Sequence, residues 1–329
     1  MKARLIHYGR LLLSSFILFL VVITVLFFLL ELAPGDPVQA LVGDVPLTDE
    51  FRERIMAAYG LDKPVWERYL IYVGNVLQGD LGYSFATNAE PVLDIILDRA
   101  GNTLAIALPS FVISTVGGLV LGSIAARTRR RWLDGGISGF AVGLFSIPNF
   151  WFGMLLIIVF AINLGWFPTH GKSPYGMPGV YLEYMVLPVL TMATTELAYK
   201  TRITRSAVIE SLGQDYIDTA RSKGLSSRRV LWRHALPNGL LPMVTVSGYS
   251  LGYILAGSVL VERVFGWPGM GLLFVDAIER KNNMLVLGIT IVLTVSIIVV
   301  NILTDVIYGI VDPRLRARFA PKKKEEVTA

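Results

Sequence analysis

The amino-acid sequence predicts an all-α protein that crosses a membrane several times. Hydrophobic residues make up 53% of its 329 residues and charged residues only 17%, whereas a soluble domain carries about 25% charged residues. Apolar runs recur that approach or exceed the roughly 20 residues that a helix needs to cross a bilayer. Basic residues cluster at the ends of these runs, which indicates membrane topology and not a surface for nucleic acid. The chain contains no cysteine, which excludes disulfides, thiolate nucleophiles and cysteine-ligated metals.

Six apolar segments are predicted to be transmembrane helices. The first is longer than the core of a signal peptide and is followed by no small-residue cleavage site, so we expect it to be retained. The fourth contains Pro188 and Glu196, and it must therefore lie inside a bundle where neighbouring helices satisfy its polar groups. The six segments are Leu11–Leu30, Thr103–Ala126, Ile137–Leu164, Tyr184–Tyr199, Leu240–Val261 and Met284–Ile310.

Four groups of basic residues orient the predicted bundle. They hold 21 of the 30 Lys and Arg residues, and the intervening loops are acidic or nearly uncharged. Because Lys and Arg accumulate in cytoplasmic loops, both termini and the segment Gln214–Pro237 are predicted to be cytoplasmic. The groups are Lys2, Arg4 and Arg10; Arg127, Arg129, Arg130 and Arg131; Lys200, Arg202, Arg205, Arg221, Lys223, Arg228, Arg229 and Arg233; and Arg314, Arg316, Arg318 and Lys322 to Lys324.

Spans and charges together predict the organisation of the chain. We expect a cytoplasmic amino terminus (1–10), a first transmembrane helix (11–31), an extracytoplasmic cap (32–101), a five-helix core (102–310) that includes a cytoplasmic loop (200–237), and a cytoplasmic tail (311–329) whose last residues are disordered.

The long loop after the first span is predicted to form the cap. Thr48–Tyr59 and Pro64–Leu77 have helical patterns, Gly79–Gly82 forms a turn, and Pro91 opens a short helix toward the second span. An apolar stripe on the second helix indicates packing of the cap rather than a ligand site. The stripe consists of Val65, Tyr69, Tyr72, Val73 and Val76.

Small residues recur at four-residue spacing within the spans and predict close contacts between helices. Prolines inside the spans predict kinks. The small residues are Ser114, Gly118 and Gly122; Gly135, Gly139 and Gly143; and Gly248 and Gly252. The prolines are Pro109, Pro148, Pro188 and Pro242.

The segment Gln214–Pro237 is the longest polar interval on the basic side of the chain. It predicts a short helix (Tyr216 to Lys223), a turn at Gly224, and a second basic helix that Pro237 ends. Composition leaves two interpretations open: a handle that another protein grips, or a basic loop that only fixes topology.

Several patterns resemble catalytic or nucleotide-binding motifs but lack their context. Gly248–Gly252 fits G-x-S-x-G, yet it lies in an apolar helix and not in a strand–turn–helix elbow. Gly165–Ser173 resembles a P-loop, but five residues separate its glycines where the motif has four, and no strand precedes it. We therefore expect no hydrolase site at Ser250, with only His7, His170 and His234 in the chain, and no ATP site.

Ionisable residues within the spans do not indicate a proton relay. They lie near the predicted span ends, where capping or hydrogen bonds between helices account for them, whereas an ion-coupled carrier keeps such groups near mid-membrane. No repeat resembles a channel filter. The residues are Glu31, Glu196, Glu262 and Asp305.

A multi-span chain with a cytoplasmic handle and no energy site suggests a membrane subunit driven by another protein. The handle resembles the EAA loop of ABC-importer permeases, E-A-A-x3-G-x9-I-x-L-P. Ala220, Gly224, Leu236 and Pro237 agree with this pattern. Asp218, Thr219 and His234 stand where the pattern has Glu, Ala and Ile.

Other stretches resemble the dipeptide and oligopeptide branch of these permeases, in particular its B-type subunit with a long outer loop. The resemblance covers nearly the whole chain. The stretches are Leu32–Pro37, Gly79–Ser84, Val261–Gly271 and Asp312–Arg314.

The resemblance implies the architecture of a type I ABC importer permease in a bacterial or archaeal inner membrane. It implies a homologous C-type permease, two cytoplasmic ATPases and an external solute-binding protein as partners, besides the lipid bilayer. No cofactor is expected in this chain, because ATP and Mg belong to the ATPases. The cargo is expected to be a short peptide. Nickel, glutathione and oligosaccharides remain alternatives within the branch, and a self-sufficient carrier or channel is the alternative of another class.

The resemblance further implies that the first helix of the handle, a coupling helix, sits in a groove of an ATPase. We expect Tyr216, Ile217 and Ala220 to form an apolar knob there, with charge around it and Gly224 as the turn. The coupling residues expected are Tyr216, Ile217, Asp218, Ala220, Arg221, Lys223, Gly224, His234 and Pro237. Substrate is expected to pass between the two permeases, along parts of the third to sixth spans.

Overall fold

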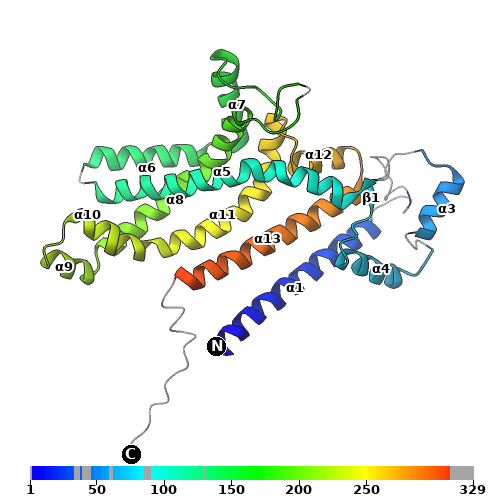
Figure 1. Ribbon diagram of the computed structural model, residues 1–329, viewed down its shortest axis with the longest axis horizontal. Helices are drawn as coiled ribbons and strands as arrows, with labels where there is room; N and C mark the ends of the chain where they lie inside the picture. Colours follow the sequence, from blue (N-terminus) through cyan, green and yellow to red (C-terminus); the bar gives the residue numbers. More distant parts are fainter. Residues whose placement is uncertain are drawn as a thin grey trace, which may run out of the picture.

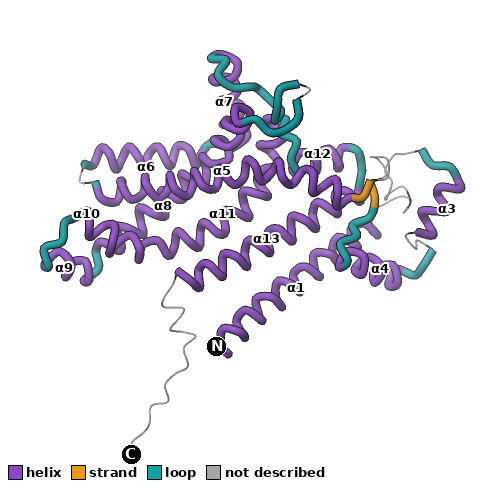
Figure 2. The backbone as a smooth tube through the Cα atoms, in the orientation of Figure 1, coloured by secondary structure: helices purple, strands orange, loops and turns teal. Residues whose placement is uncertain are grey.

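The computed structural model describes residues 2–32, 38, 46–58, 62–84, 90–128, 130–175 and 177–311. Helices dominate this part of the chain (Figure 2). Two short strands, β1 (Tyr83–Ser84) and β2 (Glu90–Pro91), pair antiparallel with Tyr83 opposite Pro91. The predicted stretches 33–37 and 312–314 and the end of the tail lie outside the described residues.

Five long helices form the body of the protein (Figure 1). Within the described residues, three segments are long and apolar enough to cross a membrane by themselves: Gly9–Leu29, Val92–Arg127 and Asn283–Val306. The expectation of a separate short helix at Pro91 is wrong, because the helix that follows Pro91 is continuous with the second predicted span. The long helices are α1 (Lys2–Glu31), α5 (Val92–Arg127), α8 (Leu182–Leu212), α11 (Leu236–Phe265) and α13 (Asn283–Val311).

The third predicted span is not one continuous helix. It consists of α6 (Arg131–Ser146), α7 (Asn149–Leu156) and the π-helical η2 (Ile157–Asn163), and its two halves meet at 102°. Pro148 explains the break, because the residue before a proline avoids the helical conformation, and Ile147 is extended with φ −89° and ψ 127°. Among the four prolines singled out above, only Pro148 coincides with a helix break.

A second bend of 81° separates the end of α11 from α12 (Met270–Glu279). Gly266 makes the turn with a left-handed φ of 55°. If each bent pair is counted as one span, the described chain has up to five candidate spans by length and composition. The polar helix α8 is not among them.

Helix α8 instead lies in the middle of the fold, in contact with α5, α6, α7 and α11. Its approach to α5 is close because that helix presents glycines. A Cβ atom at Gly118 would stand 2.5 Å from the Cβ of Lys200, and one at Gly122 would stand 2.6 Å from the carbonyl oxygen of Thr201. Gly248 of α11 meets Thr304 of α13 in the same way. The predicted close contacts are therefore confirmed at Gly118 and Gly122 of α5 and at Gly248 of α11, whereas Gly252 makes only an ordinary contact.

The glycines of α6 differ from those of α5. An added Cβ at Gly135, Gly139 or Gly143 would meet no described atom within 4 Å. Phe140 and Trp132 on the same helix are also exposed. Within the described residues, this face of α6 is therefore not covered.

The cap packs on the carboxyl-terminal end of α1, as the apolar stripe predicts. It contains α3 (Asp49–Ala58) and α4 (Val65–Leu77). Phe27 of α1 lies 5.4 Å from the ring of Tyr69 and 5.6 Å from that of Tyr72, and Arg68 pairs with Glu31. The pKa of Tyr72 is raised to about 12, because burial disfavours its charged form.

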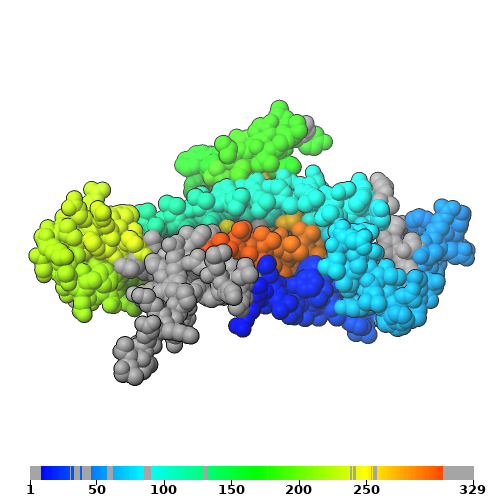
Figure 3. Space-filling model, turned by 60° about the horizontal axis from the view of Figure 1, so that its bottom comes forward, coloured from blue at the N-terminus to red at the C-terminus, as the bar shows by residue number. Residues whose placement is uncertain are grey.

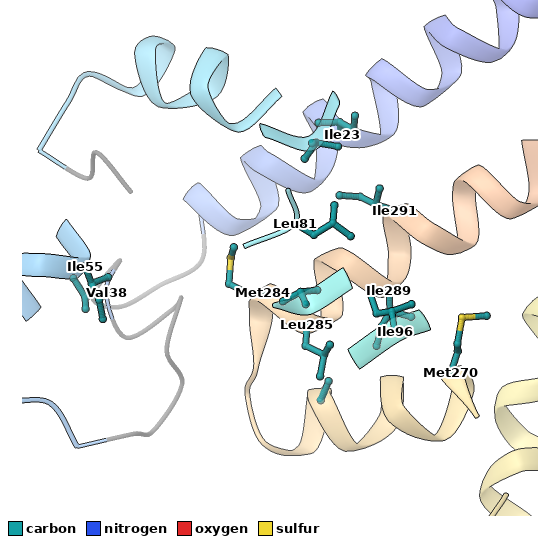
Figure 4. Packing of buried hydrophobic residues seen from close by; sticks show 13 residues of the cluster. Ile23, Val38, Ile55, Leu81, Ile96, Met270, Met284, Leu285, Ile289 and Ile291 are labelled. Atoms are coloured by element: carbon teal, nitrogen blue, oxygen red, sulfur yellow. The ribbon is translucent and has the colours of Figure 1, made fainter. Parts of the chain in front are cut away.

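The cap continues into an apolar core around the start of α13. Ile23, Leu81 and Ile289 belong to it, and Figure 4 shows Val38 beside Ile55 within the cap. The cap occupies one end of the long axis, and the segment after α8 occupies the other (Figures 1 and 3). The fold therefore separates two small non-spanning regions by the length of the bundle.

The glycine contacts between α5 and α8 give a stability prediction. Replacing Gly122 with Ala should lower the free energy of unfolding by about 1–3 kcal/mol, because the methyl group overpacks the interface. The matched change Gly101→Ala, where an added Cβ meets nothing within 4 Å, should raise it by up to about 1 kcal/mol through helix propensity. Thermal unfolding in detergent measures both, and equal shifts for the two variants would contradict the packing.

Candidate functional site

The candidate site is the polar segment that follows α8. It begins with α9 (Asp215–Ser222), turns, and continues through α10 (Ser227–Val230) and the π-helical η3 (Leu231–Ala235). The short helix and the turn are confirmed within a residue of the predicted bounds. The prediction that Pro237 ends the second helix is wrong, since η3 leads directly into α11. Pro237 lies in the first turn of α11, where its missing N–H is tolerated.

Helix α9 buries one face against its own chain. Ile217 is 0% exposed and Ala220 is also buried, and they pack against Val208 of α8 together with Val230 and Leu231. Positions three apart lie on the same side of a helix, so both residues turn inward together. The expectation that they form an outward knob is therefore wrong in this structure, where they hold α9 against the bundle.

Tyr216 links three elements by hydrogen bonds. Its hydroxyl lies 2.6 Å from Ser211 Oγ. Ser211 Oγ donates to the carbonyl oxygen of Ala235 at 2.9 Å, so the Tyr216 hydroxyl is left to donate to Ser211. The chain of bonds joins α9 to the end of α8 and to the start of α11.

The outward face of α9 is polar. Asp218, Arg221 and Lys223 are exposed, and Asp218 Oδ1 accepts a hydrogen bond from Arg221 Nη1 at 3.2 Å. His234 is half-buried and belongs to η3, not to α9. Tyr216 is the one large apolar ring among the exposed residues of α9.

Gly224 makes the turn that the sequence predicts. Its φ is +77°, a left-handed conformation that side chains with a Cβ disfavour. Its N–H donates to the carbonyl oxygen of Arg221 at 2.9 Å, which satisfies the end of α9. No neighbouring atom occupies the position of a Cβ, so the backbone conformation itself, and not a close contact, demands glycine.

Two features near this segment were not predicted. Arg205 of α8 forms a two-pronged ion pair with Asp134 of α6, with contacts of 2.6 and 2.7 Å. A basic hollow of about 410 Å³ is lined by Ser226, Arg228, Arg229, Trp232 and Arg233. The ion-pair partners are 71 residues apart, and only the opposite charges at two span ends could have suggested the pair.

The G-x-S-x-G pattern does not form a catalytic site in the structure. Gly248–Gly252 lies inside α11, where Ser250 Oγ donates to the carbonyl oxygen of Ser247 at 3.1 Å. This is helical backbone and not a nucleophile elbow. In the part of the chain that the structure describes, no three His, Asp or Glu side chains are placed to hold a metal ion.

Comparison with known families decides the nature of the chain. Residues 118–317 match the family described as "Binding-protein-dependent transport system inner membrane component", and residues 5–107 match the corresponding amino-terminal family. The chain belongs to this permease family. It is therefore the membrane component of a binding-protein-dependent transport system and not an enzyme.

Curated relatives of this permease match nearly their full length. The oligopeptide transport system permease protein AppB of Bacillus subtilis is 38% identical over 89% of this chain and 94% of its own. The dipeptide transport system permease protein DppB of Escherichia coli K12 is 36% identical over 88% of this chain and 92% of its own. The di/tripeptide transport system permease protein DppB of Pseudomonas aeruginosa is 37% identical over 88% of this chain and 92% of its own.

The permease fold also has a solved neighbour. A chain of the MetNI methionine ABC transporter in an inward-facing form superposes with a TM-score of 0.57. The match is 17% identical and covers 68% of this permease and 99% of that chain. At this identity, the likeness concerns the fold alone.

The buried face of α9 gives a prediction about its attachment. Ile217→Ala should loosen the helix by about 2–4 kcal/mol, because a fully buried side chain is cut back. Amide hydrogen exchange within residues 215–222 should then become faster. Thr219→Ala, whose hydroxyl contacts only the carbonyl oxygen of Asp215 in the same helix, is the matched control. Unchanged protection in the Ile217 variant would show that the contact does not hold α9.

Proposed function

We propose that this permease forms half of the translocation path of an ATP-driven importer of short peptides. The observation that carries the cargo is the near-full-length similarity to proteins named as dipeptide, tripeptide and oligopeptide permeases. Nickel, glutathione and oligosaccharides are other cargoes of this branch that the sequence left open. None of the three relatives described above is named for them, which favours a peptide.

The proposed partners are a homologous C-type permease, two cytoplasmic ATPases and an external solute-binding protein. The family description includes dependence on a binding protein. The uncovered face of α6, with its three glycines and exposed aromatic rings, suits close packing against another apolar helix. We assign that face to the second permease. ATP and Mg are assigned to the ATPases.

The proposed coupling element is α9. Its outward side presents Tyr216 as an aromatic anchor, with Asp218, Arg221 and Lys223 around it, to a groove of an ATPase. Ile217, Ala220 and Gly224 fix the helix on the permease. Through the bonds of Tyr216 and Ser211 and the continuity of His234 and Pro237 with α11, displacement of α9 is passed to the bundle. Such coupling transmits free energy only if the two states of the bundle contact the ATPase differently.

The proposed topology has six spans with both termini in the cytoplasm of a bacterial or archaeal cell. The spans are α1, α5, the bent α6–α7 pair, α8, α11 and α13. Helix α8 crosses despite its polarity, because the surrounding helices shield it. The α5–α6 turn and the α9–α10 segment lie at the same end of the fold (Figure 1), and both are rich in arginine, which supports a cytoplasmic position for that end.

The topology can be tested with single cysteines, since the natural chain has none. Tyr175→Cys and Thr219→Cys each introduce one thiol at an exposed position. A membrane-impermeant maleimide applied to intact cells should label position 175 and not position 219. Both should react after the membrane is permeabilised. Labelling of position 219 in intact cells would place α9 outside and contradict the coupling role.

The transport function can be tested in vesicles that contain the permease with its three kinds of partner. The wild-type complex should accumulate dialanine only when ATP is supplied on the ATPase side. Gly224→Val should leave the complex assembled and hydrolysing ATP while uptake falls at least about tenfold, because the strained turn moves α9. Gly213→Val is the control, since Gly213 has an ordinary φ of −88°.

Two outcomes would contradict this proposal. Ion-gradient-driven uptake by the permease alone, without any ATPase, would favour a self-sufficient carrier. Normal coupled uptake in Gly224→Val would remove the role assigned to α9.

A further inference from the structure

A cavity opens at the break between α6 and α7. Its volume is about 870 Å³, within the range of roughly 300–1,000 Å³ that is common for small-molecule sites. Residues 145–150 of the break form one wall, and side chains of α8 and α11 form the rest. Tyr249 on its lining is 80% exposed, so the cavity opens to the surface of this subunit.

The carboxyl group of Glu196 lines the cavity and lacks a hydrogen-bond partner on one side. Glu196 is only 7% exposed. Its Oε2 atom is buried and receives no hydrogen bond from the described residues. A largely buried carboxylate is costly, and a charged donor in the cavity would lower the cost of burying the Glu196 side chain.

Lys200, one helical turn from Glu196, does not fill this role. Its Nζ atom stands 3.8 Å from Oε2, beyond hydrogen-bond distance. The ammonium is held instead by Ser114 Oγ and Thr115 Oγ1 of α5, both at 3.0 Å. It also lies 4.6 Å from the centre of the Phe111 ring. Oε2 faces Lys200, so the lysine compensates the charge of Glu196 from within the bundle without donating a hydrogen bond to it.

Glu262 shows what a purely structural carboxylate looks like in this fold. It is 0% exposed, yet both of its oxygens accept hydrogen bonds. Thr103 Oγ1 donates to Oε1 at 2.8 Å, and the backbone N–H of Leu272 donates to Oε2 at 2.9 Å. The two buried glutamates therefore differ in kind, since only Glu196 faces a cavity with an oxygen left unbonded.

The remaining lining suits the rest of a peptide. Asn149 and Thr195 are hydrogen-bonded to each other across the cavity wall, and both types of side chain can also pair with amide groups. Phe145 and Tyr199 stack with ring centres 6.3 Å apart. An anionic point, amide-compatible groups and aromatic walls match an ammonium, a peptide bond and variable apolar side chains.

We infer that this cavity is a contact site for the transported peptide and that Glu196 accepts a hydrogen bond from its free α-amino group. The inference rests on the proposed peptide importer and deepens it by naming a point of substrate contact. A peptide enters the cavity with its ammonium toward α8 and its side chains against the rings of Phe145, Tyr199 and Tyr249. The amino group supplies a charged donor to the part of the Glu196 carboxylate that borders the cavity.

The test uses the complete importer in vesicles, with ATP and saturating binding protein loaded with dialanine. Uptake per assembled complex should fall about tenfold or more in Glu196→Gln, since a charge-assisted hydrogen bond is lost. Glu183→Gln changes an exposed carboxylate on the same helix and should retain wild-type uptake. Normal uptake in Glu196→Gln would overturn the inference, while the wild-type result would still support the peptide importer.

A double variant separates substrate contact from charge balance inside the bundle. In Glu196→Gln combined with Lys200→Met, no buried charge is left uncompensated, so assembly is safeguarded even if the single variant misfolds. Uptake should remain about tenfold below wild type. Recovery to the wild-type rate would overturn the inference, because Glu196 would then only neutralise Lys200. If the wild-type importer takes up no peptide at all, the proposed function itself fails.

Discussion

The structure depends on the shielding of one polar helix by apolar ones. Helix α8 carries threonines, Glu196, Lys200 and further charges along its length, and hydrocarbon offers no partner for such groups. The rest of the bundle supplies these partners or excludes lipid. The glycines of α5 admit α8 at close range, the hydroxyls of Ser114 and Thr115 hold Lys200, and Asp134 of α6 pairs with Arg205. A hydrophilic helix is therefore accommodated in the middle of a mostly apolar bundle.

The two ends of the molecule are attached to the bundle in different ways. The cap is fixed on α1 and α13 by apolar packing, whereas α9 is attached through a small apolar contact and a short chain of hydrogen bonds. The cavity beside Glu196 lies between them, at the break that Pro148 makes. The cap, the cavity and α9 thus follow one another along the same few helices (Figure 1).

The sequence predicted most of the fold because apolar runs, glycine spacing and basic clusters each have a direct physical meaning. The cap helices, a close helix contact at the glycines of α5 and the turn at Gly224 follow from local pattern, whereas the partner of α5 does not. A kink at Pro148 was expected, but the sharp bend of 102° was not, because apolar composition continues across it. The inward position of Ile217 and Ala220 was missed because their burial depends on Val208 of α8 and Val230 of α10. Both valines lie outside α9, and a turn separates each of them from it. The environment of Glu196 needed four elements to be placed together, and no spacing along the chain encodes that.

The π-helical turn η3 stands between α10 and α11. A π-turn accommodates one more residue than an α-helical turn, and each residue of an α-helix advances the helix by about 100°. If η3 tightened to α-helical form, the α9–α10 segment would rotate by about that angle relative to α11. In the coupling proposed above, displacement of α9 would therefore twist α11 as well as tilt it.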